Sequence, residues 1–136
     1  MKLFPWGTTP KVYVDAKILN MHDRVLREAY VGYVVEVDGR RNVMRVEAEE
    51  SDDAEVLAIL FAIRELKDSL GRFTIVCDHE SVVSEANREE VKTPSRFMGE
   101  LRETLRRNPS VTLEALKTNP AHGVVTEFVN RVNQQS

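Results

Sequence analysis

The sequence predicts an α/β fold built on a five-stranded mixed sheet, and three observations support that class. Runs rich in β-branched and aromatic residues come first, and two of them are joined by a turn at Asp38–Gly39. A long apolar helical pattern follows. Helical and strand patterns then alternate, as they do when helices pack on a sheet that contains parallel strands. The predicted order is β-β-β-α-β-α-α-β-α.

Each predicted strand has a local signal. The strands are rich in β-branched and aromatic residues or alternate apolar with polar residues. They span residues 11–16, 30–39, 41–50, 72–78 and 111–117. The polar stretch 18–29 has no clean period, and it is predicted to be a loop or a weak helix. Residues 1–10 contain prolines and a glycine, so an irregular lead-in is predicted there.

The strongest predicted helix spans residues 52–71. It opens with Asp52 and Asp53, carries Lys67 in its last turn and ends at Gly71, in agreement with helix start and stop signals. Its centre is apolar nearly all round, which indicates packing on more than one side. Shorter helices are predicted over 80–89, 93–108 and 124–134, with a loop at 119–123.

Composition narrows the class of protein. The 136 residues suit one domain, and no repeat or linker divides them, so residues 1–136 are predicted to form a single domain. A net charge of −3 gives no general attraction to nucleic acid, which would need a local basic patch. The single cysteine, Cys77, excludes an internal disulfide and a multi-cysteine zinc site. With no signal peptide and no stretch of membrane-span length, we expect a cytoplasmic location and no membrane partner.

Two acids stand at predicted strand ends. Asp15 follows "VYV" and Asp78 follows "TIVC". If these strands are parallel neighbours, both acids emerge at the edge where α/β sheets usually bind ligands. The structural alternative is that each acid caps a turn or a helix. Cys77, inside the same strand, is expected to be buried and inert.

Glu55 is the third candidate. It shares a helix face with an apolar stripe that contains Ala58, Ile59, Ala62 and Leu66, so it is expected to point toward the core or the sheet. An inward carboxylate is unfavourable unless its charge is offset, and no lysine or arginine lies on that stripe.

The other acids of this helix start leave a structural alternative. Asp52 and Asp53 are expected to face water, and Asp52 with Glu55 has the spacing of a capping box. A bound divalent cation is the functional interpretation for Glu55. Three converging acids without a histidine–cysteine cluster favour Mg²⁺ or Mn²⁺ over zinc, and two such ions can clamp a phosphodiester.

The segments that carry these acids resemble the motifs of one family. They are "VYVDA" with Asp15, "DDAEVLAILFAI" with Glu55 and "IVCDHESVV" with Asp78. In these segments and in element order, roughly residues 10 to 133 resemble a ribonuclease H domain. The resemblance implies two-metal cleavage of the RNA strand of an RNA–DNA hybrid, giving a 5′-phosphate and a 3′-hydroxyl. Asp15 and Asp78 would bind metal, and Glu55 would bind metal and orient the attacking water.

The chain departs from the family pattern at several positions. "AKILNMHDRV" replaces the glycine-rich turn after the first acid, and Thr126 falls on the position of the fourth acid. Glu127 is adjacent but about 100° around the helix, so either it substitutes or the fourth ligand is absent. His122, expected in the loop before the last helix, matches a histidine that assists proton transfer or product release. Its structural alternative is an exposed loop or helix-start residue.

Two further interpretations remain open. Arg88, Lys92 and Arg96 are predicted to line one side of a helix–loop as a basic protrusion for nucleic acid, or to form a solvated helix face. His79 is expected either to reach a phosphate or to cap a helix. The functional hypotheses are a ribonuclease H-type nuclease, an inactive module that binds nucleic acid or protein, and an unrelated α/β domain whose acids are caps. No oligomeric state is predicted.

Overall fold

The computed structural model describes residues 9–18, 27–49, 51–87, 96–116 and 121–135. Within these residues the order of elements is the predicted β-β-β-α-β-α-α-β-α. The elements are β1 (Lys11–Ile18), β2 (Arg27–Val35), β3 (Arg41–Ala48), α1 (Ser51–Leu70), β4 (Phe73–Cys77), α2 (Glu80–Ala86), α3 (Met98–Arg107), β5 (Val111–Ala115) and α4 (Ala121–Gln135).

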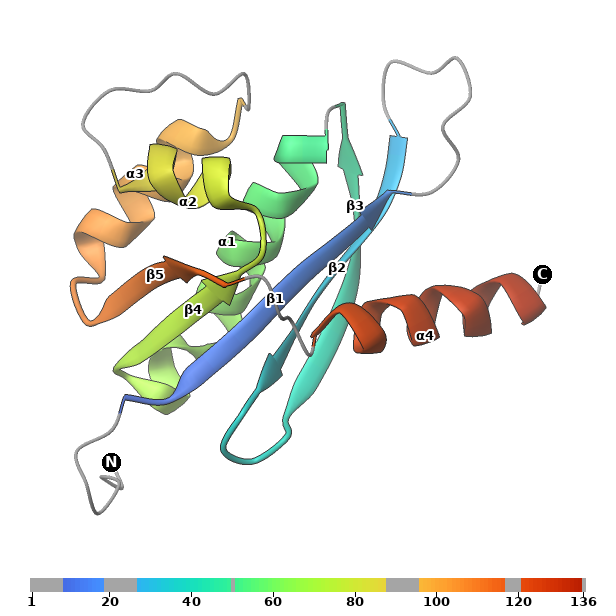
Figure 1. Ribbon diagram of the computed structural model, residues 1–136, viewed down its shortest axis with the longest axis horizontal. Coiled ribbons are helices and arrows are strands. Elements are labelled where there is room, and N and C mark those ends of the chain that lie inside the picture. Colours follow the sequence, from blue (N-terminus) through green and yellow to red (C-terminus); the bar gives the residue numbers. More distant parts are fainter. Residues whose placement is uncertain (1–8, 19–26, 50, 88–95, 117–120, 136) are drawn as a thin grey trace.

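The strands form one mixed sheet with the order β3-β2-β1-β4-β5 (Figure 1). β1 pairs antiparallel with β2, and β2 pairs antiparallel with β3. β1 pairs parallel with β4, and β4 pairs parallel with β5. The predicted five-stranded mixed sheet is therefore confirmed, and the two strands that end near Asp15 and Asp78 are parallel neighbours.

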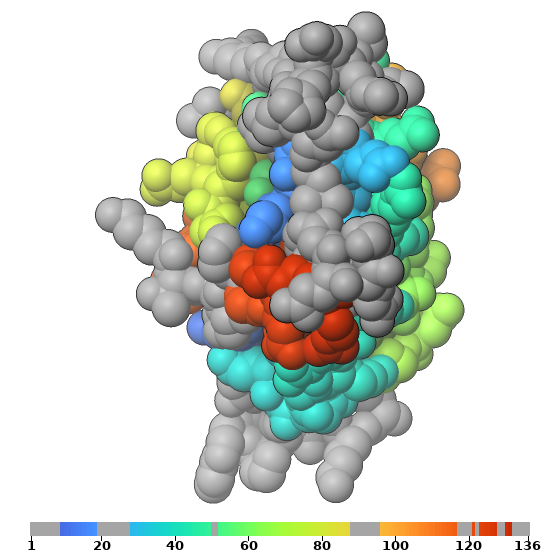
Figure 2. Space-filling model, turned by 90° about the vertical axis from the view of Figure 1, so that its right-hand side faces the viewer, coloured from blue at the N-terminus to red at the C-terminus, as the bar shows by residue number. Residues whose placement is uncertain are grey.

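Helices cover both faces of this sheet. Val12 and Val14 of β1 belong to the core that the sheet forms with α1, α2 and α3. Tyr13 faces the other way and packs with Ala121 of α4. Figure 2 shows α4 (red) lying over the strands coloured blue to cyan. Because both faces of β1 are covered, its centre is buried on both sides.

α1 is the central helix of the larger core. Its apolar residues are buried nearly all round, including Ile59, Leu60 and Ile63, which explains the absence of a polar face in the sequence pattern. It ends at Leu70, and the next residue, Gly71, has a φ of 71°, the left-handed conformation that glycine adopts without strain. The amide of Gly71 donates to the carbonyl of Lys67 at 3.1 Å and closes the last turn.

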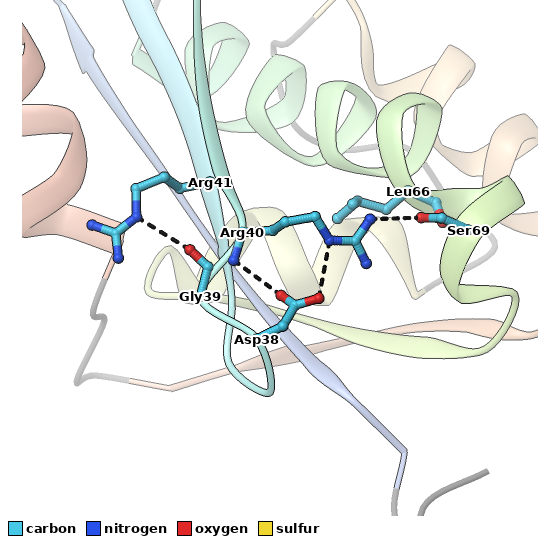
Figure 3. Close-up of polar contacts among 6 residues, drawn as sticks. All are labelled: Asp38, Gly39, Arg40, Arg41, Leu66 and Ser69. Carbon is cyan, nitrogen blue, oxygen red and sulfur yellow. Dashed lines mark hydrogen bonds and ion pairs between the residues drawn. The ribbon is translucent and has the colours of Figure 1, made fainter. Parts of the chain in front are cut away.

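The turn between β2 and β3 is held to the end of α1 (Figure 3). Asp38 accepts from the backbone amide and from Nε of Arg40, each at 3.0 Å, and Arg40 Nη1 donates to Ser69 Oγ at 3.1 Å. Gly39 has a φ of 75°, as a tight turn requires, and its carbonyl accepts from Arg41 Nε at 3.2 Å. We call these residues, Asp38–Arg41 with Ser69, the hairpin end.

Several predicted boundaries differ from the structure. Ile18 belongs to β1 and Arg27–Ala29 belong to β2, so the predicted loop or weak helix at 18–29 is wrong at both ends, while 19–26 lie outside the described residues. Ile18 pairs with Ala29 across the two strands. This cross-strand pairing outweighs the weak local pattern, as tertiary context commonly does.

The helices also differ at their ends. α4 begins at Ala121 rather than at 124, because Ala121 is fully buried against Tyr13, Val34 and Val76, and that packing extends the helix backward. α2 ends at Ala86, short of the predicted 89. α3 begins at Met98, whereas the prediction began at 93; residues 93–95 are not among those described. No helix in the described residues is long and apolar enough to cross a membrane.

Candidate metal centre

Asp15 lies in β1 and is almost fully buried, with 4% of its surface exposed. It shares a face with Tyr13, on the side of the sheet that α4 covers. The parallel register pairs Tyr13 with Val76. Continued by two residues, that register brings Asp15 level with Asp78. The two strand-end acids therefore occupy matching positions on neighbouring strands.

Gly32 lies in β2, directly opposite Asp15 of β1. A Cβ atom at Gly32 would come within 2.8 Å of Val125 Cγ2 in α4. The glycine thus lets α4 approach the sheet next to the buried acid. Gly32 is not among the residues predicted from the sequence, although a glycine inside a strand pattern is a recognised signal of close backbone approach.

Glu55 and Asp78 meet at the end of β4. Glu55 is half-buried in the first turn of α1, and Asp78 is exposed directly after the strand. One oxygen of each carboxylate and Cys77 Sγ lie within 4.8 Å of one another. The Cys77 thiol donates to Glu55 Oε2 at 3.6 Å. Among the described residues this group holds these three side chains, and Asp15 lies outside it.

Electrostatics link Asp15 to this group. Burial is the largest cause, and together with the negative charges of Asp15 and Asp78 it raises the pKa of Glu55 to about 8. Burial and the neighbouring Glu55 also raise the pKa of the Cys77 thiol. Cys77 is fully buried, as predicted. Glu55 therefore holds its proton at neutral pH unless a positive charge is supplied.

Asp15, Glu55 and Asp78 together form what we call the carboxylate end. The stripe on which Glu55 was placed is confirmed, because Ala58, Ile59, Ala62 and Leu66 are all buried. The expectation that Asp52 and Asp53 both face water is wrong. Asp53 is 2% exposed, and its Oδ2 accepts from the amide of Glu49 at 3.1 Å. Asp52 is half-buried.

Asp52 is in contact with His79. His79 Nε2 lies 2.9 Å from Asp52 Oδ1. His79 is the N-cap residue of α2, where its Nδ1 accepts from the amide of Val82 at 3.4 Å. The capping interpretation of His79 is therefore confirmed. The contact with Asp52 was not anticipated, since the two residues are far apart in the sequence.

The start of α4 lies beside Asp15 but adds no acid from the sheet-facing side. Val125 is buried, and Thr126, at the position of the fourth acid, is half-buried. Glu127 is exposed and binds Arg131 with Nη2 2.6 Å from Oε1. Glu127 would have to leave this ion pair to serve the site. His122 lies in the first turn of α4, so its predicted loop position is wrong and the alternative of a helix-start residue is confirmed.

Arg96 contacts two neighbouring side chains. Its Nη1 lies 3.3 Å from Glu49 Oε1, and its guanidinium stacks 4.8 Å from the centre of the Phe97 ring. Arg88 and Lys92, the other predicted nucleic-acid contacts, lie outside the described residues. Arg96 thus lies near the starts of α1 and α3, and about half of its side chain (49%) is exposed.

A separate groove lies between α2, α3 and β5. Its volume is about 830 Å³, and residues such as Asn87, Arg102 and Leu113 line it. None of the three acids of the carboxylate end is among its lining residues. The groove and the carboxylate end are therefore different features of the molecule.

The carboxylate end fits a hard divalent cation. Its donors are carboxylate oxygens at one sheet edge, and such oxygens are the ligands that Mg²⁺ and Mn²⁺ prefer. A cation would offset the crowding of negative charge that raises the pKa of Glu55. Asp78 is exposed, so the centre is open to solvent on that side. Asp15, Glu55 and Asp78 would hold the ion.

Comparisons with known proteins agree on architecture. No family model and no curated protein sequence matches the chain. Among solved structures, LC11-RNase H1, isolated from compost, superposes with a TM-score of 0.67 at 17% identity, over 88% of this chain and 91% of that one. The foamy virus protease–reverse transcriptase in complex with an RNA/DNA hybrid gives 0.66 at 12% identity, over 93% of this chain.

The viral matches differ in extent. The chain spans about a fifth of the hybrid-bound viral protein, since 20% of that chain is covered. A foamy virus protease–reverse transcriptase structure with double-stranded DNA gives a TM-score of 0.64 at 13% identity, over 87% of each chain. Such low identities carry information about the backbone alone. The sheet order and these superpositions together show that the chain has a ribonuclease H-like fold.

Proposed function

We propose that this chain is a divalent-metal-dependent nuclease that cleaves the RNA strand of RNA–DNA hybrids at the carboxylate end. The observation that carries the proposal is the meeting of Glu55 and Asp78 at the end of β4, where one oxygen of each carboxylate and Cys77 Sγ lie within 4.8 Å of one another. Burial and the charges of Asp15 and Asp78 raise the pKa of Glu55 to about 8, which agrees with this crowding. Acids held together in this way are characteristic of functional sites. The ribonuclease H-like fold and the similarity to a hybrid-bound viral protein add support.

The roles follow from where the acids lie. Asp15, buried on the side of the sheet that α4 covers, and Asp78, exposed after β4, would both be ligands of Mg²⁺ or Mn²⁺. Glu55 would ionise on binding, act as a ligand and orient the attacking water. When bound, the ions lower the pKa of that water and stabilise the charge on the phosphate. In-line attack would leave a 5′-phosphate and a 3′-hydroxyl.

A second function is supported by one observation. Thr126 occupies the position of the fourth acid, and Glu127 next to it is exposed and paired with Arg131. A centre that lacks a fourth carboxylate favours a module that binds nucleic acid or protein without cutting. The two functions make opposite predictions about turnover and the same prediction about folding.

The test is cleavage of labelled substrates by the purified protein. RNA–DNA hybrid, double-stranded RNA and single-stranded RNA are each incubated with Mn²⁺ and with Mg²⁺, and EDTA is the control. We expect cleavage of the RNA strand of the hybrid alone, with 5′-phosphate ends, and none in EDTA. A hybrid that is bound but remains intact with both metals would instead establish the non-cleaving module.

A further inference from the structure

His79 connects the two helices that flank the end of β4. Its Nε2 lies 2.9 Å from Oδ1 of Asp52 in the first turn of α1. Its Nδ1 accepts from the amide of Val82 and lies 3.1 Å from Ser81 Oγ in the first turn of α2. One imidazole ring therefore bonds to both helix starts. Each helix start stands beside one acid of the carboxylate end.

The placement relative to those acids is close. Asp78 directly precedes His79 in the chain, and Glu55 lies three residues after Asp52, nearly one helical turn away. The backbone of His79 makes a second connection to α1. The amide of His79 donates to Cys77 Sγ at 3.5 Å, and that thiol donates to Glu55 Oε2. Side chain and backbone of one residue thus connect Asp78 to the helix that carries Glu55.

The contacts specify a single form of the ring. A backbone amide can only donate, so Nδ1 must carry a lone pair to accept from Val82. The proton then resides on Nε2, where it is donated to the Asp52 carboxylate. The side chains of His79 and Asp52 are only 29% and 23% exposed. The hydrogen bond between them is therefore partly shielded from water, and this shielding strengthens it.

We propose that His79 is a positioning residue that, through Asp52, fixes the separation of Asp78 and Glu55 for metal binding. The inference rests on the proposed function, because it concerns how well the same centre holds its ions. His79 itself would contact neither metal nor substrate. It would act by preventing the start of α2, and Asp78 with it, from shifting against α1.

Three variants separate this role from simple helix capping. His79→Asn keeps a good N-cap acceptor but is too short to reach Asp52. Asp52→Ala keeps the cap and removes the acceptor for Nε2. Asp52→Asn removes the charge of Asp52 and keeps an acceptor oxygen. Asp38→Asn, at the hairpin end, is the control for a lost surface carboxylate.

The readouts are Mn²⁺ affinity by calorimetry, Tm, and kcat and KM on the hybrid. We expect His79→Asn and Asp52→Ala each to weaken Mn²⁺ binding roughly tenfold, as loss of an orienting contact does. They should lower kcat and leave KM for the hybrid within about twofold. The double variant should bind no more weakly than either single one, because both remove the same contact. Asp52→Asn and Asp38→Asn should bind nearly as wild type.

Other outcomes overturn the proposal. Wild-type affinity in His79→Asn would show that the contact does not matter. Equal losses in Asp52→Asn and Asp52→Ala would assign the effect to charge. Nitrogen NMR that places the ring proton on Nδ1 would contradict the geometry independently of any variant.

The wild-type protein separates this proposal from the proposed function. If it binds Mn²⁺ but leaves the hybrid intact, the proposed nuclease fails while the affinities still decide the role of His79. If it binds no Mn²⁺, both proposals fail.

Discussion

The two ends of the sheet shift the pKa values of their acids in opposite directions. At the hairpin end, Asp38 accepts hydrogen bonds from the backbone amide and the guanidinium of Arg40, and these contacts hold the pKa of Asp38 below its ordinary value. At the carboxylate end, burial and the charges of Asp15 and Asp78 raise the pKa of Glu55 to about 8. One end favours the ionised acid and the other opposes it.

This difference is the one expected if the hairpin end stabilises the fold and the carboxylate end serves the proposed function. An acid whose pKa is lowered by folding adds to stability at neutral pH, whereas an acid whose pKa is raised subtracts from it. A chain retains the second arrangement where another property, such as ligand binding, depends on it. The following predictions test that contrast by making matched changes at the two ends.

The largest expected effect is on turnover. Asp78→Asn removes the exposed ligand of the carboxylate end, so hybrid cleavage with Mn²⁺ should fall by roughly 100-fold or more, beyond the loss typical of outer contacts. Asp38→Asn makes the same chemical change at the hairpin end and should leave the rate unchanged. The measurement is initial cleavage rate at saturating Mn²⁺. Equal rates for wild type and Asp78→Asn would remove Asp78 from the reaction.

The carboxylate end could be anticipated from sequence because its signals are local. A strand-end acid, a helix-start acid and a second strand-end acid each follow from short patterns around Asp15, Glu55 and Asp78. The sheet topology that brings them together follows from the order of elements. The fold class and the edge at which the acids gather were therefore predictable.

The remaining features depend on contacts between distant segments. The Asp52–His79 contact joins two helix starts, and the close approach of Val125 to Gly32 joins α4 to β2. The strand at Arg27–Ala29 forms through cross-strand pairs despite a weak local pattern. Such features require the packed structure, since no local period encodes which residues will meet.

The second prediction tests the packing beside Asp15. Gly32→Ala would place a Cβ atom 2.8 Å from Val125 Cγ2, so the Val125 side chain or α4 must shift, and stability should fall by about 1–3 kcal/mol. Val125→Ala in the same chain should restore part of the loss by making room. Gly99→Ala is the control, because nothing lies within 4 Å of a Cβ there. Chemical denaturation measures all four proteins. A Gly32→Ala protein as stable as wild type would refute the tight approach of α4.

The third prediction concerns pH in the absence of metal. The pKa of Glu55 is raised from its ordinary value of 4.5 to about 8, so the folded state binds more protons than the unfolded state between these values. This contribution to stability is complete below pH 4.5 and is lost as the pH rises through about 8. Glu55→Gln does not titrate.

The measurement for Glu55 is Tm in EDTA across that range. The free energy of unfolding of Glu55→Gln, relative to wild type, should rise by about 1 kcal/mol between pH 5 and pH 9, allowing for partial screening of a half-buried group. A Tm difference that stays constant over this range would show that Glu55 titrates normally. Added Mn²⁺ should reduce the difference at high pH, because it stabilises only the protein that keeps the carboxylate.

The smallest effect, and the one of opposite sign, is expected at the hairpin end. The pKa of Asp38 is lowered in the folded state. Its contribution to stability is therefore present at neutral pH and is lost as the pH falls through its folded-state pKa, which lies below the ordinary value of 3.8. Asp38→Asn should therefore destabilise the protein at pH 7 by about 0.5 kcal/mol or less, as expected for an exposed ion pair. Tm measured from pH 7 down to pH 3 should show the deficit shrinking toward acid. A deficit that grows toward acid would mean that the two ends do not differ in the way their pKa values indicate.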